Sequence, residues 1–201
     1  MRLNWLNKKN NNKLIIFFNG WGMDDTAIEH LDPEDFDILT ICDYNSLEDL
    51  PNISIYEKKY VVAWSMGVMV ATLFECNQVS ATAINGTLFP IHTDYGIDPK
   101  IYKLMELGYN EQSADKFLIK MFDDTSRMIQ PKRDTTNQKT ELTALRNYHP
   151  NLGYKYTRVI ISENDKIIPS KSQKNYWGEK AEFINEGHYP FFKYNKWKEL
   201  L

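Results

Sequence analysis

The feature that most restricts the fold of this 201-residue chain is a serine between two small residues, at the junction of two expected elements. The apolar run 60–63 predicts a buried strand, and the small and apolar residues of Val68 to Glu75 predict a helix. Ser65 lies between them, two positions after Ala63 and two positions before Gly67. A sharp turn strains the backbone and tolerates only small residues at those two positions. We therefore expect Ser65 at the tip of a sharp strand-to-helix turn.

Further short apolar segments predict a mostly parallel central sheet with helices on both faces. Strands are expected at 14–18, 36–42, 81–84, 157–162 and 181–184, and helices at 169–177 and 191–201. Short apolar strands that alternate with helices are typical of this α/β class. Residues 98–148 break the alternation, because they are charged and favour helix throughout. We expect a single domain over 1–201, with 98–148 as an inserted helical lid above the carboxyl edge of the sheet.

The composition excludes several other classes of protein. With 42% hydrophobic and 13% aromatic residues the chain is globular, and its net charge of −3 is too small to predict a polyanionic partner. No apolar run is long enough for a signal peptide or a membrane span, so we expect a soluble cytoplasmic protein. Cys42 and Cys76 lie far apart and are expected to stay reduced. No metal-ligand set, phosphate loop or basic-aromatic strip is found, so neither a cofactor nor a nucleic acid is expected.

One histidine has the position of a general base for Ser65. His188 follows the last expected strand, and Gly187 before it gives the loop freedom to reach over the sheet edge. The chain has four histidines, and His188 is the only one that follows Asp165, which is the acid expected to orient it. The order serine, acid, histidine is that of the α/β-hydrolase fold. We therefore expect Ser65 as nucleophile and His188 as general base.

Asp165 is the expected acid of this set. It lies in the loop after the strand 157–162 and before Pro169, which opens a helix. A carboxylate in this loop accepts the Nδ1–H of the imidazole and fixes its tautomer. Glu163 is the alternative, because it lies closer to the strand.

The loop after the first buried strand predicts part of an oxyanion hole. Residues 18–22 read FNGWG, and glycine in such a loop lets the main chain approach a substrate closely. We expect the backbone amides of Trp21 and Met66 to be the two donors. The alternative is that Asn19-Gly20 forms only a tight turn.

Five segments together resemble the BioG group of pimeloyl-acyl-carrier-protein methyl ester esterases, within the α/β-hydrolase superfamily. They are FFNGWGMD at 17–24, VAWSMGV at 62–68, SATAINGT at 80–87, DKI at 165–167 and GHY at 187–189. The combination is distinctive because Ala63 replaces the usual glycine in the same way. The resemblance implies hydrolysis of the methyl ester of a pimeloyl group on acyl carrier protein, in the pathway to biotin. A thioesterase, a general carboxylesterase and an inactive acyl-carrier-binding protein are the alternatives.

The resemblance also implies acyl carrier protein as a partner, and because carrier proteins are acidic, docking needs positive charge. From 127 to 158 the chain carries seven basic residues and two acidic ones. The expected docking residues are Arg127, Lys132, Arg133 and Lys139; a solvated lid surface is the alternative. Apolar lid residues at helical spacing are expected to pack on the core, or alternatively to line an acyl channel: Tyr102, Met105, Phe117, Met121 and Phe122. The sequence predicts no oligomeric state.

Overall fold

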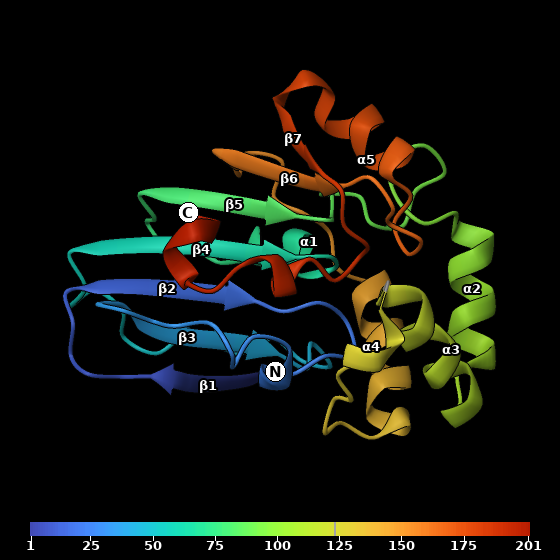
Figure 1. Ribbon diagram of the computed structural model, residues 1–201, viewed down its shortest axis with the longest axis horizontal. Helices are drawn as coiled ribbons and strands as arrows, with labels where there is room; N and C mark the ends of the chain where they lie inside the picture. Colours follow the sequence, from blue (N-terminus) through green and yellow to red (C-terminus); the bar gives the residue numbers. More distant parts are fainter. Residues whose placement is uncertain (123) are drawn as a thin grey trace.

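The chain forms a seven-stranded β-sheet in a computed structural model that describes residues 1–122 and 124–201. The strands are β1 (Arg2–Asn7), β2 (Lys13–Phe18), β3 (Asp37–Cys42), β4 (Lys58–Trp64), β5 (Ser80–Ile84), β6 (Arg158–Ser162) and β7 (Ala181–Ile184). They lie in the order β1-β3-β2-β4-β5-β6-β7, and the pairs are parallel except for β1 with β3 (Figure 1). The predicted mostly parallel α/β sheet is confirmed.

The middle strands are apolar throughout because both faces of the sheet are covered. In β2, Ile15 and Phe17 belong to the core on one face. Leu14, Ile16 and Phe18 belong to the core on the other face. The edge strand β1 was not expected from the sequence, because its polar and apolar residues are mixed and none of its residues is fully buried.

Helical segments cover both faces. One face carries α1 (Gly67–Ala71) and α5 (Ser170–Trp177). The other face carries three 3-10 helices, η1 (Asp25–Ala27), η4 (Phe191–Lys193) and η5 (Trp197–Leu200). A further 3-10 helix, η3 (Gly178–Lys180), links α5 to β7. The helix expected at 169–177 is confirmed. The helix expected at 68–75 ends early, at Ala71. The Thr72 hydroxyl donates to the Met69 carbonyl three residues back, at 2.7 Å, and the turn there tightens.

The helix expected at 191–201 is wrong, since η4 and η5 are separate short 3-10 helices. Phe191 and Trp197 both pack edge-on against Phe17, with ring centroids 5.7 and 5.4 Å away. In an α-helix, residues six positions apart lie about 240° apart around the axis. A continuous helix therefore could not place both rings on the same residue of β2.

The segment between β5 and β6 forms a separate layer of helices. These are α2 (Pro99–Gly108), α3 (Glu111–Met121), η2 (Thr125–Arg127) and α4 (Thr135–Arg146). They gather beyond the carboxyl ends of the parallel strands (Figure 1). Each α-helix begins at a side-chain cap: Asp98, Asn110 and Asp134 accept backbone amides of the first turn. Within the described residues, no helix has the length and apolar character needed to cross a bilayer.

The approach of the β5 end to the turn after β4 leaves no room for a side chain at Gly86. A Cβ there would lie 2.3 Å from the Ser65 carbonyl oxygen and 2.7 Å from the Val68 side chain. We expect Gly86→Ala to lower the free energy of unfolding by about 1–3 kcal/mol, as overpacking does elsewhere. Urea denaturation measures this change.

Gly108 is the matched control, because a Cβ there would meet nothing within 4 Å. Gly108→Ala, at the end of α2, should leave the stability unchanged or raise it by up to about 1 kcal/mol. Equal losses in the two variants would contradict the role of close packing at Gly86.

Candidate active site

Ser65 occupies a strained position immediately after β4. Its φ of +56° lies in the left-handed region, which non-glycine residues rarely adopt. Its amide donates to the Ile84 carbonyl at 2.9 Å, so the neighbouring strand end holds the turn. A Cβ at Gly67 would lie 2.4 Å from the Phe18 carbonyl oxygen and 2.5 Å from that of Asn19. This close approach to the end of β2 is the physical reason for glycine two residues after the serine.

The structure brings the three side chains predicted from the sequence together. His188 Nε2 lies 2.9 Å from Ser65 Oγ, and His188 Nδ1 lies 2.8 Å from Asp165 Oδ2. The three residues follow β4, β6 and β7, and they are 5%, 7% and 1% exposed for Ser65, Asp165 and His188. Glu163, the alternative acid, is exposed to solvent. A hydroxyl, an imidazole and a carboxylate in this order can carry out nucleophilic acyl transfer.

The orientation of the Asp165 carboxylate is set by donors within its own loop and on α5. Oδ1 accepts the amides of Ile167 and Ile168 at 2.8 and 3.0 Å. Oδ2 accepts the side-chain amide of Gln173 at 2.9 Å, beside the imidazole. Gln173 was not identified from the sequence, because a polar residue inside an expected helix gives no sign that it faces inward.

Two further side chains hold the loop of His188, and both were missed. Asn85 is fully buried, and its Nδ2 donates to the His188 carbonyl at 3.0 Å and to Ser162 Oγ at 2.8 Å. Its Oδ1 accepts the Ser162 amide at 2.7 Å. Trp64 Nε1 also donates to the His188 carbonyl, at 2.9 Å. The only sequence signal for Asn85 is its place before Gly86 at a strand end.

The two residues predicted to supply the amides of the oxyanion hole line the same cavity as Ser65. Trp21 and Met66 both line a small cavity that includes Ser65 and His188. In the part of the chain that the structure describes, neither backbone N–H donates to a protein acceptor. Asn19 shapes the loop from within: its Oδ1 accepts the Gly20 amide at 2.9 Å, and its Nδ2 donates to the Asp24 carbonyl at 2.8 Å.

The cavity above Ser65 is narrow and apolar. Its volume is about 10 Å³, room for roughly one water molecule. Three of the apolar lid residues line it, namely Met105, Phe117 and Met121. The other two, Tyr102 and Phe122, are buried in the two cores of the molecule.

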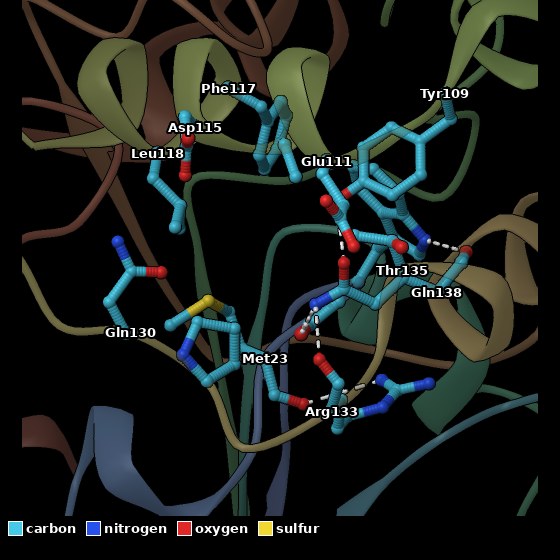
Figure 2. Close-up of a pocket in the computed structure, with 14 residues that line it drawn as sticks. Met23, Tyr109, Glu111, Asp115, Phe117, Leu118, Gln130, Arg133, Thr135 and Gln138 are labelled. Carbon is cyan, nitrogen blue, oxygen red and sulfur yellow. Dashed lines mark hydrogen bonds between the residues drawn. The ribbon is translucent and has the colours of Figure 1, made fainter.

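A larger cavity of about 310 Å³ lies between α3, the loop before α4, and α4 itself (Figure 2). Trp21 and Phe117 line both cavities, and their rings pack edge-on with centroids 4.8 Å apart. The larger cavity therefore shares two of its lining residues with the small cavity at Ser65. Glu111 and Asp115 also line it, together with the amide side chains of Gln130 and Gln138.

The four basic residues expected at a docking surface do not share one environment. Arg127 and Lys132 are exposed, and the Arg127 guanidinium lies 3.9 Å above the Phe192 ring. Lys139 is half-buried and donates to the Leu107 carbonyl at 3.2 Å.

The expectation for Arg133 is wrong. Its side chain is only 2% exposed, and its guanidinium forms ion pairs with Glu141 at 2.8 Å and with Asp43 at 3.3 Å. A buried guanidinium held in this way presents no charge to a partner.

The two cysteines do not form a further reactive centre. Cys42 and Cys76 are free and buried, and burial raises the pKa of their thiols, to about 11 and about 12. Over residues 1–122 and 124–201, no three His, Cys, Asp or Glu side chains are grouped to hold a metal ion.

Asn85 gives a test of how the histidine loop is held. Asn85→Ala removes the partners of the buried Ser162 amide and leaves the loop carbonyls with fewer donors. The free energy of unfolding should fall by about 2–4 kcal/mol, as expected when buried polar groups lose their partners. Asn175→Ala is the control, because this exposed side chain makes a single hydrogen bond, to the Asp94 carbonyl, and its loss should cost less than about 0.5 kcal/mol. A loss at Asn85 no larger than at Asn175 would contradict the role of Asn85.

Comparison with known proteins identifies the family of the chain. A profile of the family described as pimeloyl-ACP methyl esterase BioG matches residues 1–200. A crystal structure of BioG from Haemophilus influenzae is 30% identical and superposes with a TM-score of 0.92, covering 100% of this chain and 99% of that one. Naproxen esterase (carboxylesterase NP) from Bacillus subtilis has a TM-score of 0.55 at 15% identity, over 93% of this chain and 80% of that one, and shows the fold alone.

One relative has a name that refers to a different reaction. Malonyl-[acyl-carrier protein] O-methyltransferase of Bacteroides fragilis (strain 638R) is 39% identical over an aligned length of 176 residues, and the match covers 81% of this chain and 36% of that protein. The chain thus spans about a third of the length of this relative, so the name describes a much longer protein. From the profile match and the BioG structure, this chain belongs to the BioG family of pimeloyl-ACP methyl esterases, which has the α/β-hydrolase fold.

Proposed function

We propose that this chain hydrolyses the methyl ester of a pimeloyl group carried by acyl carrier protein, and releases methanol and pimeloyl-acyl carrier protein in biotin biosynthesis. The observation that carries the proposal is the hydrogen-bonded series Ser65–His188–Asp165 at a strained turn. Family membership supports the substrate, because the family is described by this activity.

The geometry supports a two-step mechanism. Ser65 Oγ attacks the ester carbonyl while His188 Nε2 takes its proton, and the amides of Trp21 and Met66 stabilise the tetrahedral oxyanion. The C–O bond to the methoxy group breaks, and His188 returns the proton to the leaving methanol. A water molecule then gives a proton to His188 and attacks the acyl-enzyme carbonyl. His188 returns that proton to Ser65 Oγ as the bond from the acyl group to the serine breaks and the free acid leaves. Asp165 holds the imidazole in the required tautomer throughout.

The Bacteroides relative supports a methyl ester on a carrier-bound acyl chain. Its name describes methyl transfer to a malonyl group on acyl carrier protein. Such a transfer produces a methyl ester on an acyl-carrier-linked chain, which is the chemical class that the proposed esterase consumes. The two names differ in the reaction and in the acyl group, which is malonyl in one and pimeloyl in the other.

The helices between β5 and β6 act in this proposal as a lid, over residues 98–148. A cavity that holds roughly one water molecule cannot hold an acyl chain, so side chains of α2 or α3 must move before the substrate enters. The larger cavity is the proposed space for the incoming chain, because Trp21 and Phe117 line both this cavity and the cavity at Ser65. This role gives Phe117 a place in the acyl path.

Docking of the acidic carrier is proposed at the basic residues that remain accessible. Arg127 and Lys132 flank the loop that leads into α4, and Lys139 lies on α4 itself. A carrier held there would present its acyl chain at the helical layer above Ser65. The arm that joins the acyl chain to the carrier has a fixed length. From this docking position the methyl ester at the far end of the chain would reach Ser65, and the thioester near the carrier would not.

Ser65→Ala tests the chemistry. The substitution should abolish labelling by a fluorophosphonate and lower kcat for methanol release by at least about 10³-fold, because the nucleophile is lost. His188→Ala should do the same. Methanol release is measured with pimeloyl methyl ester on acyl carrier protein, and kcat/KM is compared with that for the thioester and for p-nitrophenyl esters. A wild-type chain that is not labelled is an inactive binding protein, and a preference for the thioester or for free esters would replace the proposed substrate.

A charge reversal tests the carrier surface. Arg127→Glu with Lys132→Glu should raise KM for the carrier-bound substrate about tenfold, which corresponds to about 1.4 kcal/mol, and leave KM for a p-nitrophenyl ester unchanged. Lys58→Glu is the matched control, because Lys58 is exposed at the start of β4, at the opposite end of that strand from Ser65. If the carrier-bound substrate is unaffected, docking does not use Arg127 and Lys132.

A further inference from the structure

Glu141 is a fully buried carboxylate that the mechanism above does not use. It reaches from α4 to the loop after β2, and its Oε2 accepts the Gly22 amide at 3.1 Å. Its Oε1 accepts the Tyr44 amide at 2.7 Å. Arg133 Nη1 donates to Oε2 at 2.8 Å. The carboxylate therefore connects the inserted helices to the loop that contains Trp21.

Gln138, one turn earlier on α4, contacts the same loop from a second side. Its backbone carbonyl accepts the indole N–H of Trp21 at 2.8 Å, and its Nε2 donates to the Gly22 carbonyl at 3.0 Å (Figure 2). Glu141 and Gln138 thus bind both the amide and the carbonyl of Gly22. This residue has a φ of +76°, a conformation that depends on glycine and on contacts that hold it.

The peptides on both sides of Trp21 are held by hydrogen bonds that do not use the Trp21 amide. The peptide before Trp21 is held because the Gly20 carbonyl accepts the Met23 amide at 3.3 Å. The peptide after Trp21 is held because the Gly22 amide donates to Glu141. Since an oxyanion hole stabilises the transition state only when its donors are already oriented, the contacts to α4 bear directly on the rate.

We propose that Glu141 is a positioning residue for the oxyanion hole: with Gln138, it fixes the loop so that the Trp21 amide points at the oxyanion. This inference rests on the proposed function. It assigns the inserted helices a second role besides covering Ser65, and it explains why Arg133 is buried. The guanidinium offsets the negative charge of Glu141, which would otherwise oppose an oxyanion formed nearby.

The electrostatic environment agrees with this role. Burial raises the pKa of the Glu141 carboxyl, while Arg133 and the amides of Tyr44 and Gly22 act in the opposite direction. Glutamine at this position would offer one acceptor atom in place of two, and its NH₂ group would face a backbone amide. One of the two amides that Glu141 binds, that of Gly22 or that of Tyr44, would then lose its acceptor.

Glu141→Gln is the test, with a p-nitrophenyl ester as substrate and a trifluoromethyl ketone as inhibitor. The ketone forms a tetrahedral adduct with the serine, so its Ki reports on the oxyanion hole. We expect kcat to fall by about 10–100-fold and Ki to rise by a similar factor, with KM within about twofold of wild type. A purely structural role would lower the amount of folded enzyme without moving Ki and kcat together.

Glu106→Gln is the matched control. Glu106 is also a buried lid glutamate in an ion pair, with Arg146 at 2.6 Å, and it accepts the Thr143 hydroxyl at 2.8 Å. It makes none of the contacts to Trp21 or Gly22. Its kcat and Ki should equal those of wild type.

Gln138→Met keeps the test decisive if Glu141→Gln does not fold. It removes the contact to the Gly22 carbonyl, preserves side-chain length, and should lower kcat about 3–10-fold with a parallel rise in Ki.

Wild-type kcat and Ki in a folded Glu141→Gln or Gln138→Met variant would overturn the inference, as would an equal effect of Glu106→Gln. A wild-type chain that neither cleaves the ester nor reacts with a fluorophosphonate would instead overturn the proposed function, and this inference with it.

Discussion

The left-handed backbone at Ser65 is the constraint on which the rest of the site depends. A non-glycine residue in this conformation costs of the order of 1–3 kcal/mol, so the surrounding structure must hold it. Here the hydrogen bond from Ser65 to Ile84 and the contact of Gly67 with the carbonyls at the end of β2 supply that support. In this conformation the Ser65 hydroxyl projects from the turn and lies within hydrogen-bond distance of the His188 imidazole. A flexible serine in a loop would reach the same place only part of the time.

The parallel sheet explains why residues so far apart in the chain meet. Five neighbouring strands, β2, β4, β5, β6 and β7, end at the same edge. The residues that follow them include, in the same order, Trp21, Ser65, Asn85, Asp165 and His188. Ligands of open α/β sheets bind at this carboxyl edge because consecutive strand ends deliver side chains there. Asn85 lies between the serine and the acid, and it links the loops of β6 and β7 by hydrogen bonds rather than by chemistry.

The inserted helices are part of the site and not only its cover. α2 and α3 contribute Met105, Phe117 and Met121 to the cavity above Ser65, whereas α4 contacts the loop of Trp21 through Gln138 and Glu141. This difference suits two roles within one insertion. In the proposed mechanism, α2 or α3 moves to admit an acyl chain, while α4 stays in place and keeps the loop of Trp21 oriented. Arg133 also belongs to the interior of this insertion. The sequence suggests a surface charge at this position, but the guanidinium forms a buried ion pair with Glu141.

The sequence by itself determined the parallel α/β sheet, most of its strands, the turn at Ser65 and the resemblance to BioG. These features are local, because a run of apolar residues predicts a buried strand and small residues around a serine predict a sharp turn without any knowledge of distant parts of the chain. It also gave the order of Ser65, Asp165 and His188, although their contact required the folded chain. Only the tertiary structure decided the edge strand β1, the two 3-10 helices at 191–201, and the inward positions of Asn85, Gln173, Arg133 and Glu141. Each of these depends on partners distant in the chain, since a polar residue becomes internal only where folding brings it the hydrogen bonds that burial requires.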